Sequence, residues 1–247
     1  DASNSTADSV FIQQSWDPKL RRRVDKFQKE YVCTYYLPGY YRAKLILNDS
    51  IVREHDVYLE SQGWLAVIEK KPIPIYFDKS NIEAEDRMSI SEADISRYGI
   101  DLANEIPWVS FNKVDKNKTV PSDNFSMEVD LRNTYNKGDA VCQHTRIVLL
   151  GTDNVIVIPI SIKGCVGELE LVIADEKIRG STKDLSSFGV DFNDWATIRY
   201  EVKNNYAKLF VNNRLAFEGK QRGKLGRIVG ARLKFKGAGE FRRFELN

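Results

Sequence analysis

Hydrophobic and polar residues alternate with a period of two along much of the second half of the chain. Every second residue is apolar in 125–131, 198–202 and 231–235. This pattern predicts strands that bury one face and expose the other. Asn-Asn pairs at 204–205 and 212–213 predict two-residue hairpin turns between such strands. Two packed antiparallel sheets satisfy the pattern, so we expect a jelly roll here.

The first part of the chain also predicts strands, but shorter ones. Residues 31–36, 41–47 and 51–59 are rich in aromatic and β-branched side chains, with turn residues between them. Two more short apolar runs follow, at 64–68 and 73–77. Short strands at this spacing predict a small β-sandwich.

Local charge divides the chain into three expected segments. Residues 1–80 are nearly balanced, 81–105 contain 2 basic and 7 acidic residues, and 106–247 have an excess of basic residues. Within the acidic segment, Ser91 followed three residues later by Asp94 predicts a helix N-terminus. We therefore expect a β-sandwich domain over 1–80, a connector with a short helix over 81–105 and a jelly-roll domain over 106–247.

The composition sets limits on the class of protein. The chain has 247 residues, of which 42% are hydrophobic and 29% charged, which is typical of globular proteins and excludes a disordered chain. The net charge of +2 gives no reason to expect a nucleic-acid partner. The polar opening at 1–9 lacks an initial Met, so we expect an upstream signal peptide or membrane anchor, or a shortened product. An extracytoplasmic location follows, in the periplasm or at the cell surface.

A motif in the first segment resembles a known family. Ser15-Trp16-Asp17 precedes the run Tyr36-Leu-Pro-Gly-Tyr-Tyr-Arg-Ala-Lys-Leu45. The combination resembles the polycystic-kidney-disease (PKD) type of immunoglobulin-like domain, over about residues 8–78. The basic insert Lys19–Lys29 departs from the shorter Gly-rich turn of that family. The resemblance implies an immunoglobulin-like β-sandwich that acts as a spacer.

A second resemblance covers residues 107–247. The recognisable order is a Trp, a strand, a turn, a strand and an Asn-Asn turn. The segments that carry the resemblance are Asn124–Asn133, Asp194–Tyr200 and Ala207–Arg214. This is similar to the concanavalin A-like, laminin-G-like jelly rolls of bacterial extracytoplasmic proteins. That fold includes lectins, glycosidases and adhesion modules, so the resemblance implies a fold and not an activity.

Glycoside hydrolysis requires two carboxylates that approach one sugar bond. Two pairs have the i,i+2 spacing that places both side chains on one face of a strand, namely Glu168 with Glu170 and Glu128 with Asp130. Glucanases of the jelly-roll fold carry a Glu-x-Asp-x-x-Glu strand, which neither pair completes. We interpret both pairs as solvated sheet faces and assign no catalytic residue.

The cysteines and histidines give no metal or cofactor motif. Cys33 is isolated, whereas Cys142 and Cys165 lie in apolar stretches of one region, where buried thiols and a disulfide both remain open. Cys142 and His144 share a side of their segment, which we interpret as a strand entering a core rather than a nucleophile and base. We expect no metal and no cofactor, although calcium held by scattered backbone carbonyls would leave no motif.

Binding signals are concentrated near the end of the chain. Residues 214–243 contain ten basic and two acidic residues. Arg232, Lys234 and Lys236 alternate, so they project from one face of one strand. Such a face attracts polyanions such as acidic polysaccharide, although long cationic side chains also solubilise exposed sheets.

Aromatic residues supply the other binding signal, because sugars stack on exposed rings. Tyr135 falls in a loop outside any alternating pattern, and Arg132 precedes it on a polar face. We take these two as candidate ligand contacts together with the cationic row. Trp108 and Trp195 precede strands at apolar positions and are expected in the core.

The sequence thus predicts an all-β protein, an immunoglobulin/PKD-like β-sandwich followed by a concanavalin A-like jelly roll. We expect non-catalytic recognition, with a polysaccharide or cell-surface glycan as ligand and the first domain as spacer. Two alternatives remain: a glycoside-active enzyme that uses one of the carboxylate pairs, and a sensor or structural ectodomain that binds a protein.

Overall fold

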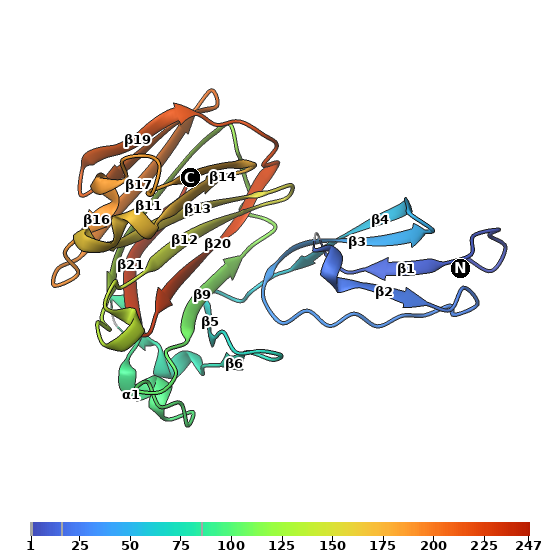
Figure 1. Cartoon of the computed structure of the whole chain (residues 1–247), viewed down its shortest axis with the longest axis horizontal. Helices are drawn as coiled ribbons and strands as arrows, with labels where there is room; N and C mark the ends of the chain where they lie inside the picture. Colours follow the sequence, from blue (N-terminus) through green and yellow to red (C-terminus); the bar gives the residue numbers. More distant parts are fainter. Residues whose placement is uncertain (1, 16, 85) are drawn as a thin grey trace. The chain divides into compact units, whose positions relative to one another are not determined.

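The computed structural model describes residues 2–15, 17–84 and 86–247. The chain divides into two compact units, Asp1–Glu60 (unit 1) and Ser61–Asn247 (unit 2). Both units are built from mainly antiparallel sheets, with β16 parallel to β13 (Figure 1), so the predicted all-β class is confirmed. Among the described residues there is no helix with the length and hydrophobicity needed to cross a bilayer.

Unit 1 contains one antiparallel sheet with the strand order β2-β1-β3-β4. Its elements are β1 (Val10–Gln13), η1 (Pro18–Leu20), β2 (Arg21–Val24), β3 (Gly39–Leu47) and β4 (Ser50–Leu59). The second sheet of a sandwich is not found among the described residues of this unit. Trp16 of the PKD-type motif lies outside the described residues, and the PKD resemblance stays a prediction.

The strand predicted at residues 31–36 is wrong, because this segment has no regular structure. Strand-forming side chains give a strand only where a partner strand accepts their backbone hydrogen bonds, and no ladder involving 31–36 is found in the described part of the chain. Val32 is accordingly 88% exposed. Tyr35 still anchors the segment, because its hydroxyl donates to the backbone oxygen of Gln14 at 2.8 Å.

Unit 2 is formed by two sheets. The larger has the order β15-β14-β13-β12-β20-β9-β5-β6, with β10 beside β20 and β16 beside β13. Its strands are β5 (Leu65–Ile68), β6 (Ile75–Tyr76), β9 (Trp108–Val114), β10 (Val120–Pro121), β12 (Thr145–Gly151), β13 (Val155–Ile162), β14 (Glu170–Ile173), β15 (Glu176–Arg179), β16 (Gly189–Val190) and β20 (Arg227–Lys236).

The smaller sheet has the order β19-β18-β17-β11-β21-β8-β7. Its strands are β7 (Glu83–Ala84), β8 (Arg87–Ile90), β11 (Asn124–Asn133), β17 (Ala196–Lys203), β18 (Tyr206–Val211), β19 (Arg214–Lys220) and β21 (Gly239–Leu246). The remaining elements are α1 (Glu92–Ser96), η2 (Lys79–Asn81), η3 (Gly138–Ala140), η4 (Lys163–Glu168) and η5 (Ser186–Phe188). All four residues of the two Asn-Asn pairs have positive φ, as the predicted hairpin turns require.

The division between the units differs from the predicted boundaries at 80 and 105. Residues 61–105 belong to unit 2, because β5 pairs with β9 and β8 pairs with β21. Local charge contains no information about such long-range pairing. The predicted helix is present as α1, and Ser91 and Asp94 cap its N-terminus reciprocally.

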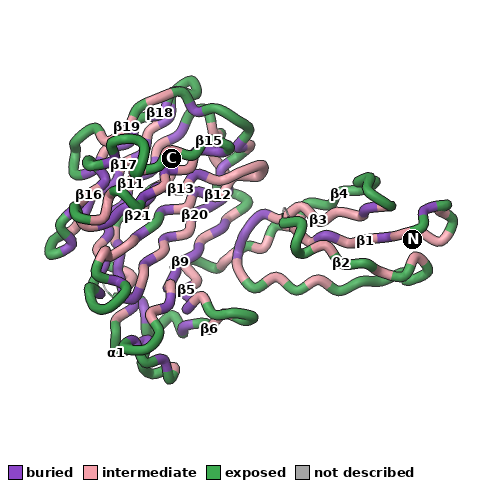
Figure 2. The backbone as a smooth tube through the Cα atoms, viewed as in Figure 1, coloured by how far each residue is buried: buried purple, intermediate pink, exposed green. Residues whose placement is uncertain are grey.

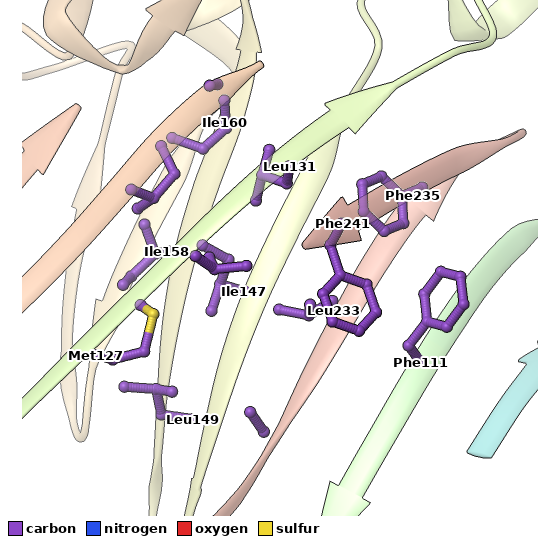
Figure 3. Close-up of a cluster of buried hydrophobic side chains, with 14 of the residues drawn as sticks. Phe111, Met127, Leu131, Ile147, Leu149, Ile158, Ile160, Leu233, Phe235 and Phe241 are labelled. Atoms are coloured by element: carbon purple, nitrogen blue, oxygen red, sulfur yellow. The ribbon is translucent and has the colours of Figure 1, made fainter. Parts of the chain in front are cut away.

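The core of unit 2 lies between the two sheets (Figure 3). In Figure 2, buried and less buried positions alternate along its strands, as the period-two pattern predicts. Phe111 of the larger sheet meets Phe241 of the smaller sheet edge to face, with ring centroids 5.1 Å apart. Leu131 and Ile147 are fully buried in the same cluster. This core fixes which side chains each sheet presents outward.

A disulfide joins Cys142 to Cys165, with the two Cα atoms 5.6 Å apart. It connects the segment that leads into β12 with η4. Cys33 is a free cysteine, and burial raises the pKa of its thiol. A disulfide fits an oxidising compartment, which agrees indirectly with the expected extracytoplasmic location.

Replacing both Cys142 and Cys165 by Ser is expected to lower the free energy of unfolding of unit 2 by about 3 kcal/mol, because the bridge closes a loop of 23 residues. Urea unfolding followed by tryptophan fluorescence measures this change, since three of the four tryptophans lie in unit 2. Cys33→Ser is the control and should leave the midpoint unchanged. An unchanged midpoint in the double variant would contradict the expectation.

Candidate functional site

The outer face of the larger sheet carries the predicted row of cations. Arg232, Lys234 and Lys236 of β20 alternate with Leu233 and Phe235, which are fully buried in the core. All three cationic side chains therefore lie on the side of the sheet that faces away from the core. The sequence predicts this shared face correctly.

Strand register brings two further side chains to this row. Arg146 of β12 lies directly opposite Lys234, and Trp108 of β9 lies opposite Lys236. We call the outer surface formed by Trp108, Arg146, Arg232, Lys234 and Lys236 the β20 face. Its members come from three adjacent strands, β9, β20 and β12, near the middle of the larger sheet (Figure 1).

The three cations of β20 each have a partner within unit 2. Arg232 Nε donates to Oδ1 of Asn112, Lys234 Nζ lies 2.6 Å from Oε2 of Glu69, and Lys236 Nζ donates to the backbone oxygen of Ile106 at 2.5 Å. Burial lowers the pKa of Lys234, and the neighbouring Glu69 carboxylate partly opposes this shift. These contacts hold the ends of the cationic side chains in place.

Trp108 is half-buried and lies outside the hydrophobic core, so the expected core position is wrong. The guanidinium carbon of Arg146 lies 4.8 Å from the centroid of its ring, and Lys234 Nζ lies 5.2 Å from it. Cations attracted to the ring quadrupole hold the indole on the sheet. Trp108 is the first residue of β9, and its apolar character alone does not indicate which face of the sheet its ring occupies.

Arg146 is the exposed cation of the β20 face that sequence reasoning missed. It has no carboxylate within ion-pair distance among the residues that the structure describes. Its charged neighbours are Lys234 across the strands and Glu170, whose pKa Arg146 helps to lower. The sequence does indicate that Arg146 lies on the outer face of β12, because it alternates with the apolar positions of that strand. A single basic residue inside an apolar run was too weak to single out.

A cleft of about 340 Å³ adjoins Arg146 on the same face. It is lined by His144, Thr145, Arg146, Val157, Pro159, Glu168, Leu169, Glu170 and Val172. The cleft lies where β14 separates from β13. The ladder between these two strands includes only Ile156 and Val157 of β13. Two residues further along β13, Pro159 has no N–H to continue a ladder.

Polar side chains of opposite charge line the cleft. His144 Nε2 lies 3.0 Å from Oε2 of Glu168, and Arg179 Nε donates to Glu170 at 2.7 Å. The disulfide between Cys142 and Cys165 links two segments that line the cleft. Cys142 is two residues before His144, and Cys165 is three residues before Glu168, on η4. The structure thus brings together hydrogen-bond donors and acceptors from separate segments of the sequence.

Glu170, one carboxylate of the enzymatic alternative, does not have the property of a general acid, which needs a raised pKa. The hydrogen bond from Arg179 lowers the pKa of Glu170, with Lys177 acting in the same direction. Cys142 is in the disulfide and therefore offers no thiolate beside His144.

Arg132 lies on the outer face of the smaller sheet, so it does not belong to the β20 face. Its side chain pairs with the buried carboxylate of Glu240, with Nη2 2.5 Å from Oε1. Trp195 also lies outside the core, with the guanidinium carbons of Arg132 and Arg242 at 5.1 and 4.4 Å from its ring centroid. The expectation of a core position for Trp195 is therefore wrong as well.

A β-bulge brings two consecutive arginines to Asp130. Neighbouring residues of a regular strand point to opposite faces, but Arg243 has a φ of 50° and the register with β11 shifts here. Arg242 Nε and Arg243 Nε therefore both donate to Asp130, at 3.1 and 2.6 Å. Burial by itself raises the pKa of Asp130, but hydrogen bonds from Thr197 and the two arginines outweigh it and lower the pKa.

Tyr135 is not an exposed stacking platform, which corrects the expectation from the sequence. Its side chain is only 4% exposed, and its hydroxyl donates to the backbone oxygen of Leu102 at 3.2 Å. Gly237 packs directly on the ring, where an added Cβ would come within 2.6 Å. The loop folds inward because a glycine opposite leaves room for the ring.

No protein-family model matches the chain, and no curated protein sequence matches it. Solved structures that are similar include the carbohydrate binding module CBM66 from Bacillus subtilis (8% identity, 75% of this chain and 95% of that chain, TM-score 0.41). An alginate lyase from Corynebacterium sp. (9%, 75% and 93%, TM-score 0.44) and the carbohydrate recognition domain of Emp47p (14%, 75% and 88%, TM-score 0.45) are also similar. Likeness at this level carries no argument about ligand or activity.

Asp130→Asn is expected to lower the free energy of unfolding by about 2 kcal/mol at neutral pH, because it weakens hydrogen bonds to charged groups at a buried site. The folded-state pKa of Asp130 is lowered, so its stabilisation is present above the ordinary pKa of about 4 and is lost as the pH falls through the folded value. The difference between wild type and variant should therefore shrink in acid.

Urea unfolding at neutral and acidic pH measures this difference. Glu128→Gln, on the same strand, is the matched control, because Glu128 is an exposed partner of Arg199 at 3.9 Å and should contribute less than about 1 kcal/mol. An effect of Asp130→Asn that stays constant with pH would contradict the assignment.

Proposed function

We propose that unit 2 binds an acidic polysaccharide on the β20 face and performs no chemical step on it. The observation that carries the proposal is the half-buried Trp108 ring on an outer sheet face, flanked by the exposed Arg146. An indole offers apolar surface to the C–H groups of a sugar ring, while a guanidinium binds a carboxylate through two parallel hydrogen bonds.

Arg146 is the cation suited to contact the ligand. Lys234 is tied to Glu69 and Arg232 to Asn112, so these two orient the face rather than supply free donors. Arg146 is exposed and has no carboxylate within ion-pair distance among the described residues, although it helps to lower the pKa of Glu170 in the cleft. A ligand carboxylate therefore replaces water at Arg146 without breaking an existing ion pair.

The adjoining cleft supplies polar contacts for a second sugar. Its volume of about 340 Å³ is at the lower end of the range of ligand sites. His144, Glu168 and Glu170 present acceptors and donors to sugar hydroxyl groups, whereas Val157 and Val172 provide apolar surface. We propose that one sugar packs on Trp108 and a neighbouring sugar enters this cleft.

We further propose that unit 1 is a spacer and that the protein acts outside the cytoplasm. The disulfide between Cys142 and Cys165 supports an oxidising location. The protein-binding alternative stays a prediction, as does an upstream anchor. The enzymatic alternative has less support, because the lowered pKa values of Glu170 and Asp130 suit stable carboxylates rather than a proton donor.

Calorimetric titration of the full chain with polygalacturonate, at low salt, tests the proposal. Trp108→Ala and Arg146→Gln are each expected to weaken binding about tenfold, which corresponds to about 1.4 kcal/mol. Binding to wild type should weaken in added salt, and Arg146→Gln should reduce this salt dependence. Dextran, an uncharged polymer, should bind much more weakly.

Two variants on the smaller sheet are matched controls for these substitutions. Trp195→Ala removes an indole and Lys208→Gln removes a positive charge, and neither should change the affinity. Equal binding of polygalacturonate to wild type and to Trp108→Ala would overturn the assignment of the site. Absence of binding to wild type would overturn the proposed ligand class.

A further inference from the structure

Three metal-ligating side chains converge beside the cleft, and a disulfide links a fourth to them. Ligand atoms of Cys142, His144 and Glu168 all lie within 4.8 Å of one another. Cys165 is covalently bonded to Cys142, so a second sulfur lies beside that of Cys142. The four residues form two close pairs along the chain, Cys142 with His144 and Cys165 with Glu168.

This set of side chains matches the preferences of one class of ion. Zn²⁺ takes four ligands in a tetrahedron and accepts thiolate, imidazole and carboxylate donors. In the disulfide the two sulfurs carry no charge and are poor ligands. Reduction of the bond supplies the two thiols that complete a set of two sulfurs, one nitrogen and one oxygen.

We propose that the chain binds one Zn²⁺ through Cys142, Cys165, His144 and Glu168 when its disulfide is reduced. A dithiol reductant transfers two electrons and two protons to the bond, which gives two cysteine thiols and the cyclic disulfide of the reductant. Zn²⁺ then binds the two sulfurs as thiolates, and the two thiol protons pass to solvent. The disulfide and the metal are alternative cross-links of the same two segments.

The backbone around the site is held independently of the disulfide. The backbone oxygen of Cys142 accepts from Ile162 N at 3.2 Å, and that of His144 accepts from Lys236 N at 2.9 Å. The Gln143 side chain between them donates to the backbone oxygen of Asn133 at 2.7 Å. Because these bonds join the segment to β13, β20 and β11, Cys142 and His144 keep their places when the bond to Cys165 opens.

The other half of the site also has local support. η4 ends at Glu168, and Leu169 N donates to the backbone oxygen of Val166 at 3.2 Å. His144 Nε2 and Oε2 of Glu168 are 3.0 Å apart, a separation that one ion bridges with a small outward shift of either side chain. Two thiolates and a carboxylate around Zn²⁺ leave a net charge of −1, which the nearby Arg146 and Arg179 partly balance.

Cobalt titration of the full chain with Cys33→Ser, without polysaccharide, tests this proposal, because His144 and Glu168 also line the cleft proposed for a second sugar. The protein is reduced with a dithiol, freed of the reductant without air, and titrated with Co²⁺ as a coloured probe for Zn²⁺. One equivalent should give thiolate-to-cobalt charge-transfer and tetrahedral ligand-field absorption, and Zn²⁺ should displace it. The oxidised chain should give neither band.

Variants distinguish the four-ligand site from two bare thiols. His144→Ala and Glu168→Gln should each weaken Co²⁺ binding at least tenfold, about the smallest loss seen even for outer partners of metal ligands. His55→Ala removes the other histidine, and Glu176→Gln removes a carboxylate elsewhere; both should leave binding unchanged. Binding that survives both His144→Ala and Glu168→Gln would overturn the proposal.

Thermal unfolding gives a second readout that does not depend on the spectrum. The folded arrangement holds the four ligands together and so binds Zn²⁺ more tightly than the unfolded chain does. Zn²⁺ should therefore raise the melting temperature of the reduced chain and leave that of the oxidised chain unchanged. If reduction itself unfolds the protein, added Zn²⁺ should restore the folded state. No effect of Zn²⁺ on the reduced chain in either case would overturn the proposal.

Discussion

Burial of the inward side chains of two sheets against each other is the constraint on which the rest of unit 2 depends. Phe111 and Phe241 meet across this interface, and rows such as Met127 to Leu131 and Ile147 to Leu149 fill it. Because strand side chains alternate, fixing the inward rows also fixes the outward ones. A shift of β20 by one residue would move Lys234 into the core, so the cationic row is a consequence of the apolar one.

The outer faces of the two sheets share one arrangement of side chains but differ in how its charges are paired. Each has a tryptophan flanked by cations, Trp108 on the larger sheet and Trp195 on the smaller. On the smaller sheet, buried Asp130 and Glu240 form ion pairs with the arginines beside the ring. On the larger sheet, Glu69 pairs with Lys234, and Arg146 has no carboxylate within ion-pair distance among the described residues. This difference makes the larger sheet the stronger candidate for an external anion.

Much of unit 2 could be predicted from the sequence, because its information is local. Alternation identified the faces of β20, and the Asn-Asn pairs identified two hairpin turns. The neighbours Arg146 and Lys234 are 88 positions apart, and no local pattern reveals that β12 lies beside β20. The burial of Tyr135 also depends on a residue far away in the sequence, Gly237, so no local pattern reveals it. The aromatic segment 31–36 shows the converse, since strong strand propensity without a partner strand gives no strand.

The strand order also sets the timing of folding during synthesis. β20 lies between β12 and β9, and β21 lies between β11 and β8, so both occupy inner positions of their sheets. Neither sheet is continuous until residues 227–246 have left the ribosome, although the strands on either side are made much earlier. The nascent chain therefore carries unpaired strand edges from the time the earlier strands emerge until β20 and β21 follow, and completion of these two strands closes both sheets almost together.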